Sequence, residues 1–368
     1  MVTRSLTGLR VRRLVALGVL VCLLGAGAAE ARVDRPDGTG ARCKIVKRKV
    51  HGKIRKVRVC KKKAPPPIAR ITATIKLEGL VYDALFSEGS LWVRVDGNNR
   101  SLGDLVERID PATNAVVARI SVGEGYGIAA GEGAIWAPNN DTNTLSRINP
   151  ASNTVTATFP LPVTGPHAVT TAGGSVWVGS DGPPELPGSV TRVDPASGAV
   201  LADIRLPGAN GTVDMAATGG AVWVAAQATI VRVDPAGNAI TATITAGTTA
   251  VCGGMVSDLG AVWVAGGAQN CGGGLDLARI DPNSNSIVAD VRIQRQQAED
   301  VAVGLGAVWA VTSGRPTYLA RVNQTSNALT GTMTLGSRPT ARMAVGGGAV
   351  WVASSGEVIR LEPRVTPG

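Results

Sequence analysis

The apolar positions of this chain fall into short runs that end in tryptophan and are separated by glycine-rich or polar segments. Most runs read Gly-Ala-Val-Trp, and the others are close variants such as Gly-Ser-Leu-Trp. A fixed period of 20 to 50 residues is the sequence signature of a repeat architecture. The runs recur every 40 to 46 residues, with tryptophan at Trp92, Trp136, Trp177, Trp223, Trp263, Trp309 and Trp351.

A second motif follows each tryptophan by 9 to 16 residues and consists of an arginine, an apolar residue and then Asp, Asn or Glu. Because both residues recur in every unit, we expect structural roles for them. The tryptophans should pack between units, and the arginines should bind neighbouring turns through charge-assisted hydrogen bonds. The seven arginines are Arg108, Arg147, Arg192, Arg232, Arg279, Arg321 and Arg360.

Each unit is predicted to contain four short β-strands. Turn residues such as Pro-Ala-Thr-Asn at 111–114 separate β-branched runs, which is a hairpin signal. The first two strands lack alternating polar positions, so both of their faces should be buried. Radial stacking of four-stranded sheets supplies a neighbour on each side. The sequence therefore predicts an all-β fold, a seven-bladed β-propeller over residues 68–364.

The order of the repeats also predicts how the ring closes. The propeller begins with Ile-Thr-Ala-Thr-Ile at 71–75, which matches the fourth strand at 240–244, whereas the last unit ends after its third strand. We expect the N-terminal strand to complete the last blade, which would cover two exposed sheet edges.

The pattern Gly-Ala-Val-Trp-Val, followed by Arg-Val-Asp-Pro-Ala-Gly-Asn-Ala-Ile-Thr-Ala-Thr-Ile, resembles the YVTN-type and virginiamycin B lyase-like propeller repeats of exported bacterial proteins. The resemblance covers the chain from about residue 68 onward. It implies the propeller fold, but the same repeat serves enzymes, sensors and binding modules.

The first 31 residues have the form of a secretory signal peptide: an arginine-rich start, an apolar stretch at 14–29 and Ala-Glu-Ala at 29–31. We expect a secreted, periplasmic or cell-surface protein. The net charge of +10 is unevenly placed, since residues 42–63 hold 12 Lys and Arg and no acid. Residues 64–368 hold 19 basic against 24 acidic residues. The high pI of the whole chain therefore comes from one short basic segment.

Four cysteines remain after the predicted cleavage site, and an even number in an exported protein suggests disulfides. The local pairings are Cys43 with Cys60 and Cys252 with Cys271.

The basic segment at 43–60 is predicted to form a β-hairpin with its turn at His51 and Gly52, which places Cys43 opposite Cys60. A Pro-rich linker follows, so we expect a separate unit at 32–67. The charge suggests attachment to an anionic cell-wall polymer or lipid surface. No aromatic residue is available for base stacking, so we do not expect specific nucleic-acid binding. The candidate polyanion-binding residues are Lys47, Arg48, Lys49, Lys53, Arg55, Lys56 and Arg58.

Function should lie where the repeats differ. Alignment of the units on their tryptophans gives one variable column at the start of the first strands, expected to surround the mouth of the central channel. His167 joins this column only with a one-residue insertion. Carboxylates with one imidazole suit a hard cation such as Ca²⁺ or Mg²⁺, and the alternative is a polar lining in which Arg342 pairs with neighbouring aspartates. The column reads Asp83, Gly127, His167, Asp214, Gly254, Asp300 and Arg342.

Two functions remain open from the sequence. The first is a non-enzymatic, monomeric binding or scaffold propeller that recognises a protein or small ligand on its variable loop face. The second is a metal-dependent lyase or lactonase at the channel mouth, with Asp83, Asp214 and Asp300 as metal ligands. The scarcity of histidine, with only His51 and His167 in the chain, favours the first. The resemblance to the lyases implies a histidine-based site, which this sequence does not reproduce.

Overall fold

The computed structural model describes residues 42–50, 53–61, 67–97, 103–182, 186–208, 211–226, 229–246, 253–258, 260–267, 275–294, 296–312, 314–338, 341–354 and 356–364. The predicted signal peptide lies outside these residues. Every regular element within them is a β-strand, and none of them belongs to a helix long and apolar enough to span a bilayer. The chain divides into two compact units, Met1–Pro66 and Pro67–Gly368.

The first unit contains an antiparallel hairpin formed by β1 (Arg42–Val50) and β2 (Lys53–Lys61). Val50 lies opposite Lys53, and Cys43 lies opposite Cys60, which is the predicted register. The same register sets basic residues against each other, with Lys47 opposite Lys56 and Arg48 opposite Arg55.

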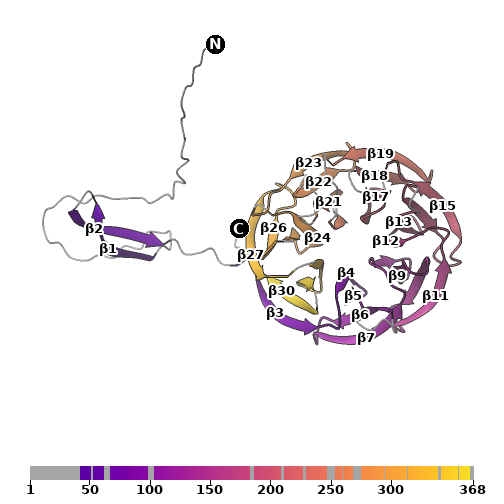
Figure 1. Ribbon diagram of the computed structural model, residues 1–368, viewed down its shortest axis with the longest axis horizontal. Helices are drawn as coiled ribbons and strands as arrows, with labels where there is room; N and C mark the ends of the chain where they lie inside the picture. The colour runs from indigo at the N-terminus through magenta and orange to yellow at the C-terminus, as the bar shows by residue number, and fades with distance from the viewer. Residues whose placement is uncertain are drawn as a thin grey trace, which may run out of the picture. The chain divides into compact units, whose positions relative to one another are not determined.

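The second unit is a seven-bladed β-propeller whose four-stranded sheets are arranged radially (Figure 1). Its first three blades are built from consecutive strands. Blade 1 contains β4 (Val81–Ser87), β5 (Ser90–Val95), β6 (Asp104–Asp110) and β7 (Ala115–Val122). Blade 2 contains β8 (Ala129–Gly131), β9 (Ala134–Asn139), β10 (Thr144–Asn149) and β11 (Thr154–Pro160). Blade 3 contains β12 (Pro166–Ala172), β13 (Ser175–Ser180), β14 (Ser189–Val193) and β15 (Val200–Arg205).

The next three blades follow the same order. Blade 4 contains β16 (Asp214–Thr218), β17 (Ala221–Ala226), β18 (Thr229–Asp234) and β19 (Ala239–Thr245). Blade 5 contains β20 (Met255–Asp258), β21 (Ala261–Ala265), β22 (Leu277–Asp281) and β23 (Ser286–Asp290). Blade 6 contains β24 (Ala298–Gly304), β25 (Ala307–Thr312), β26 (Thr317–Val322) and β27 (Leu329–Gly336).

Blade 7 combines both ends of the propeller. Its first three strands are β28 (Arg342–Gly346), β29 (Ala349–Ser354) and β30 (Glu357–Pro363). The fourth strand is β3 (Ala69–Lys76), which pairs antiparallel with β30 and lies at the outer rim (Figure 1). Strand β3 therefore hydrogen-bonds to an edge that the C-terminal repeat leaves open.

Burial differs between the strands of a blade, and the first strands have both buried and partly buried positions. The tryptophan-bearing second strands are buried at every position, as in β5 and β29. The outer strands alternate instead, and β19 has only exposed and partly buried positions. Apolar clusters lie between neighbouring blades: one contains Trp351 of blade 7 together with Leu91 and Val93 of blade 1. Apolar sequence on both faces of the inner strands thus holds the blades together.

The predicted structural roles are seen for the tryptophans and for four of the arginines, which hydrogen-bond to turns of the next blade: Arg108, Arg192, Arg232 and Arg360. The tryptophans are 0–2% exposed, and Arg108 lies over the Trp92 ring at 5.0 Å. Arg108 also reaches blade 2, where its Nη1 donates to Pro150 O at 2.6 Å and to Asn153 Oδ1 at 3.0 Å. Arg192 makes the equivalent bonds to blade 4. These contacts form at the ends of the blades away from the start of the first strands.

Candidate functional site

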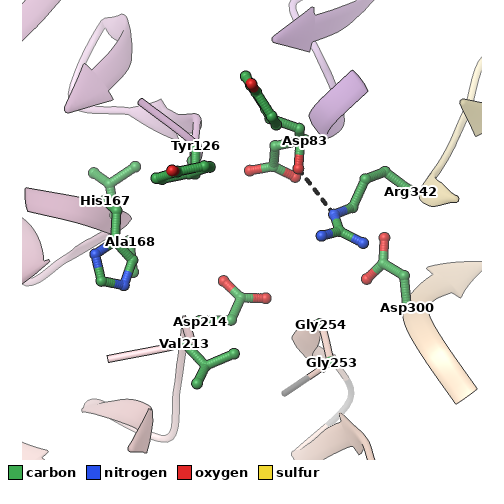
Figure 2. Close-up of a pocket in the computed structure, with 13 residues that line it drawn as sticks. Asp83, Tyr126, His167, Ala168, Val213, Asp214, Gly253, Gly254, Asp300 and Arg342 are labelled. Atoms are coloured by element: carbon green, nitrogen blue, oxygen red, sulfur yellow. Dashed lines mark hydrogen bonds between the residues drawn. The ribbon is translucent and has the colours of Figure 1, made fainter. Parts of the chain in front are cut away.

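The starts of the seven first strands surround a cavity of about 90 Å³ in the propeller (Figure 2). All seven residues of the variable column line it. The cavity is also lined by Tyr82, Tyr126, Ala168, Val169, Val213 and Gly253. Sequence alignment of the repeats therefore located the residues that share the channel mouth, although it does not say what they do there.

His167 occupies a different position from the one that the alignment assigned. A register shift between Pro166 and Ala168 makes His167 the extra residue of a β-bulge, and Ala168 takes the aligned position opposite Gly179. The bulge nevertheless leaves the imidazole at the cavity. Its Nδ1 lies 3.0 Å from Gly165 O, and its Nε2 hydrogen-bonds to Thr212 O of blade 4.

The three column aspartates each link two blades. Asp300 Oδ1 accepts from Val301 N at 2.8 Å in its own blade, and Oδ2 accepts from Met343 N at 2.7 Å in blade 7. Asp83 binds Ala84 N and Ile128 N in the same way, and Asp214 binds Met215 N and Met255 N. Buried N–H groups that would otherwise lack partners are thereby satisfied.

The remaining column residues complete a ring of hydrogen bonds between blades. Gly127 N donates to His167 O at 2.9 Å, and Gly254 N donates to Glu299 O at 3.0 Å. Arg342 Nε donates to Tyr82 O at 2.8 Å, which connects blade 7 to blade 1 (Figure 2). With the His167 contact, each of the seven blade junctions is crossed at the channel mouth.

At two positions of this ring only glycine fits, because a Cβ atom would overlap with the next blade. A Cβ at Gly254 would lie 1.7 Å from Asp300 Oδ1, so a larger residue would displace the aspartate. A Cβ at Gly127 would lie 2.5 Å from His167 O. Close packing against the next blade thus explains glycine at positions 127 and 254.

The expected metal site of Asp83, Asp214 and Asp300 is not assembled. No group of three or more His, Cys, Asp or Glu side chains suited to a metal ion occurs within the described residues. The three carboxylates belong to different blades, and each is held in place by two backbone N–H donors of its own and the next blade.

The electrostatics of the cavity favour protonated carboxyl groups. Burial raises the pKa of Asp214 to about 8, and the charge of Asp83 adds to this effect. Burial also raises the pKa of Asp300 to about 7, although Arg342 opposes the shift. The pKa of Asp83 is raised by burial as well. Desolvation disfavours a charged carboxylate, and repulsion between like charges has the same direction.

An aromatic wall on blades 1–3 was not predicted from the sequence. The rings of Tyr82 and Tyr126 meet edge to face with centroids 5.2 Å apart, and Tyr126 meets His167 at 6.2 Å. Tyr126 is 53% exposed. The sequence did contain a signal for this wall, because Tyr82 and Tyr126 directly precede the column residues Asp83 and Gly127.

A buried ion pair holds the segment that carries Tyr126. Arg94 is 0% exposed, and its guanidinium donates to the carbonyl oxygens of Gly123, Gly127 and Pro138 at 2.6–3.1 Å. Asp104 Oδ2 lies 3.5 Å from Arg94 Nε and accepts from Gly125 N at 2.8 Å. A sequence signal existed here, because the residue two after the tryptophan is small or apolar in the other blades. Those residues are Pro138, Gly179, Ala225, Ala265, Val311 and Ala353.

The other predicted site residues belong to the first unit or lie outside the described part of the chain. Cys252 and Cys271 lie outside the described residues. The hairpin belongs to the first unit, where Lys47, Lys49, Lys53 and Lys56 are exposed. Cys43 and Cys60 are opposite each other in its register.

No family model matches this chain, and no curated protein matches it. Solved structures do match. Virginiamycin B lyase from Staphylococcus aureus aligns with a TM-score of 0.64 and 15% identity, covering 79% of this chain and 99% of the lyase. Hydrazine synthase from Kuenenia stuttgartiensis aligns with a TM-score of 0.62 and 10% identity, covering 79% and 97%. At these identities the likeness shows the seven-bladed propeller fold alone.

Proposed function

We propose that this protein is a non-enzymatic binding propeller that receives a small polar ligand at its channel mouth. The observation that carries the proposal is the cavity itself, because it is lined by residues that differ from blade to blade on a scaffold that otherwise repeats. Recognition sites usually lie on such variable positions of a rigid framework.

The contacts of the polar groups favour binding over catalysis. A general acid or base must exchange its proton with substrate during each turnover. Here both oxygens of Asp83, Asp214 and Asp300 already accept backbone N–H groups that join two blades. Both nitrogens of His167 lie within hydrogen-bond distance of backbone carbonyl oxygens. Such fixed groups are suited to presenting a constant binding surface.

A ligand-observed NMR screen of small polar compounds tests the proposal. The substitution Val213→Trp fills the cavity while leaving the bridging carboxylates in place, so it should abolish binding of the hits. Thr218→Trp is the matched control, since Thr218 lines a separate cavity of about 500 Å³ at the opposite ends of the first strands. Hits that bind wild type and both variants equally would contradict a channel-mouth site.

A lyase or lactonase activity is the second candidate, and the raised pKa values of Asp214 and Asp300 favour it. A carboxyl group with a pKa near 7 to 8 can act as an acid or base at neutral pH. The fold is shared with virginiamycin B lyase. Incubation with virginiamycin B, with and without Mg²⁺ or Ca²⁺, followed by mass spectrometry tests this. Product that disappears in Asp214→Asn would establish the enzyme.

We also propose that the basic hairpin attaches the protein to an anionic phosphate-bearing surface, either a lipid or a wall polymer. Like charges directly opposite in a sheet destabilise it, and the register sets Lys47 against Lys56 and Arg48 against Arg55. A polyanion would relieve this repulsion. Lys47→Gln with Lys56→Gln should weaken sedimentation with anionic vesicles or isolated walls, whereas Lys76→Gln on the propeller should not.

Export and disulfide formation complete the proposal. The sequence of residues 1–31 supports cleavage of a signal peptide, and the register supports a Cys43–Cys60 bond. N-terminal sequencing of the secreted protein should begin at Arg32, and non-reducing peptide mapping should recover linked Cys43 and Cys60 peptides. Free thiols at both positions in secreted protein would contradict the disulfide.

A further inference from the structure

We propose that the channel-mouth cavity takes an alkylammonium group, presented by a small primary amine or by a lysine side chain. This inference rests on the proposed binding function and names the class of ligand. Four features of the cavity support it: carboxylate oxygens that can accept further hydrogen bonds, an aromatic wall, arginines that already contact other groups, and a small volume.

The carboxyl groups retain capacity to accept hydrogen bonds from a ligand. Each oxygen of Asp83 and Asp214 receives one backbone N–H, and a carboxylate oxygen can accept two bonds. Figure 2 shows the carboxyl groups of Asp83, Asp214 and Asp300 around the open centre of the cavity. An ammonium group has three donors and no acceptor, which complements a surface composed of acceptors.

The spread of these carboxylates suits an ammonium group better than a divalent metal. Mg²⁺ and Ca²⁺ require several oxygen atoms that converge at 2.0 to 2.6 Å, roughly. The described residues do not form such a group. Hydrogen bonds from an ammonium nitrogen are longer, about 2.7 to 2.9 Å, and can be shared between carboxylates on different blades.

The aromatic wall provides a second, independent contact for a cation. Tyr82, Tyr126 and His167 meet edge to face on one side of the cavity. Aromatic faces attract ammonium groups through their quadrupoles. Tyr126 is half exposed, yet the Arg94–Asp104 pair fixes the backbone on both sides of it. A solvent-facing aromatic residue with such a buried support, present in one blade only, is consistent with ligand contact.

Arg342 opposes the burial that raises the pKa of Asp83 and Asp300, so it partly offsets these two carboxyl groups, whereas Asp214 is the column acid most in need of a cation. Arg342 Nη1 lies 3.5 Å from Glu299 Oε1, and Arg342 Nε donates to Tyr82 O. Glu299 is 5% exposed, and its Oε2 has no hydrogen-bond partner among the described residues. Arg94 is committed to Asp104 and to backbone carbonyls. Acidic groups therefore outnumber the positive charge available to them at this mouth.

The size of the cavity suits a small ammonium head group. Its volume of about 90 Å³ has room for several water molecules, since each needs roughly 10–15 Å³ by this measure. An alkylammonium head with one or two methylene groups displaces that water.

Binding should release protons. Asp214 faces Asp83, Tyr126, His167, Asp300 and Arg342 across the cavity (Figure 2). An arriving cation favours the ionised form of Asp214, whose pKa in the free protein is about 8. Amine affinity should therefore rise as the pH increases from 6 to 8, by at most about tenfold per pH unit for each proton released.

Titration calorimetry of the full-length protein with n-butylammonium chloride tests the inference, with 1-butanol, butyrate and sodium chloride of equal ionic strength as matched probes. Nα-acetyl-lysine amide distinguishes a side-chain source from a free amine. We expect the two amines to bind, with butanol and butyrate at least about tenfold weaker. Asp214→Asn should weaken amine binding by about tenfold or more, and Thr218→Trp should leave it unchanged.

A second variant distinguishes the loss of a ligand contact from a loss of folding. Tyr126→Leu leaves the ring of hydrogen bonds intact, because its side chain is exposed, and should also weaken amine binding. Equal binding of butanol and butylammonium, lost in Val213→Trp, would overturn the ligand class while the proposed binding function stands. If no probe of any charge binds at the cavity, both proposals fail.

Discussion

At the scale of single residues, Asp300 shows how a candidate ligand also holds the fold. It is 7% exposed and joins the N–H groups of Val301 and Met343 on adjacent blades. Removal of a buried hydrogen-bond acceptor leaves its donors unsatisfied at about 1–3 kcal/mol each. Asp300→Ala should thus lower the unfolding free energy by about 2–5 kcal/mol in denaturant titrations. The exposed Glu124→Ala is the control, and an equally small effect in both would contradict the bridging role.

Substitution of Arg94 should loosen one segment of the channel mouth, residues 123–127. Truncating one partner of a buried pair leaves the other charge uncompensated and costs about 3–5 kcal/mol. Arg94→Met should therefore destabilise the protein and speed amide hydrogen exchange at residues 123–127, where its carbonyl partners lie. Arg94→Lys should rescue little, because one ammonium group cannot reproduce the guanidinium fork. Unchanged exchange in that segment would show that Arg94 does not position Tyr126.

At the scale of elements, β3 connects the N-terminal end of the propeller to its last blade. Ile75 is 6% exposed and packs in the same cluster as Trp351 and Val358, whereas Ile71 of the same strand is 41% exposed. Large-to-small substitutions at buried sites cost about 2–5 kcal/mol. We expect Ile75→Ala to lower the melting temperature clearly and Ile71→Ala to lower it much less. Equal effects would mean that β3 contributes little to the closure of the ring.

The elements were largely predictable because their signals are local and repeated. Tryptophan spacing and turn residues located the strands of each blade, and recurrence identified Trp92 and Arg108 as structural. The bulge at His167 was not predictable, since it depends on how β12 pairs with β13. The orientation of the aspartates could not be predicted from the sequence either. It is fixed by backbone N–H groups of the next blade, which lie 41 to 45 residues away in the chain. The aromatic wall arises from the residues directly before the aligned position, which carry a ring in three blades only: Tyr82, Tyr126 and His167.

At the scale of the whole molecule, the carboxyl groups at the channel mouth should make stability depend on pH. The raised pKa values of Asp214 and Asp300 mean that folding takes up protons between the unfolded pKa near 4 and the folded values of about 8 and 7. Their contribution is complete below about pH 4 and is lost as pH rises through these folded values. The unfolding free energy of wild type should fall relative to Asp214→Asn between pH 5 and 8, by at most about 1.4 kcal/mol per pH unit for this group. Parallel curves would contradict the shift.

The central claim is that the seven blades meet around a site that accepts a ligand. A crystal structure of the protein soaked with small amines and neutral alcohols tests it most directly. We predict ordered ligand density in the cavity between Tyr126 and Asp214, with an amine nitrogen hydrogen-bonded to at least two of the column carboxyl groups. Ordered ligand elsewhere on the propeller, with only water at the channel mouth, would contradict the account.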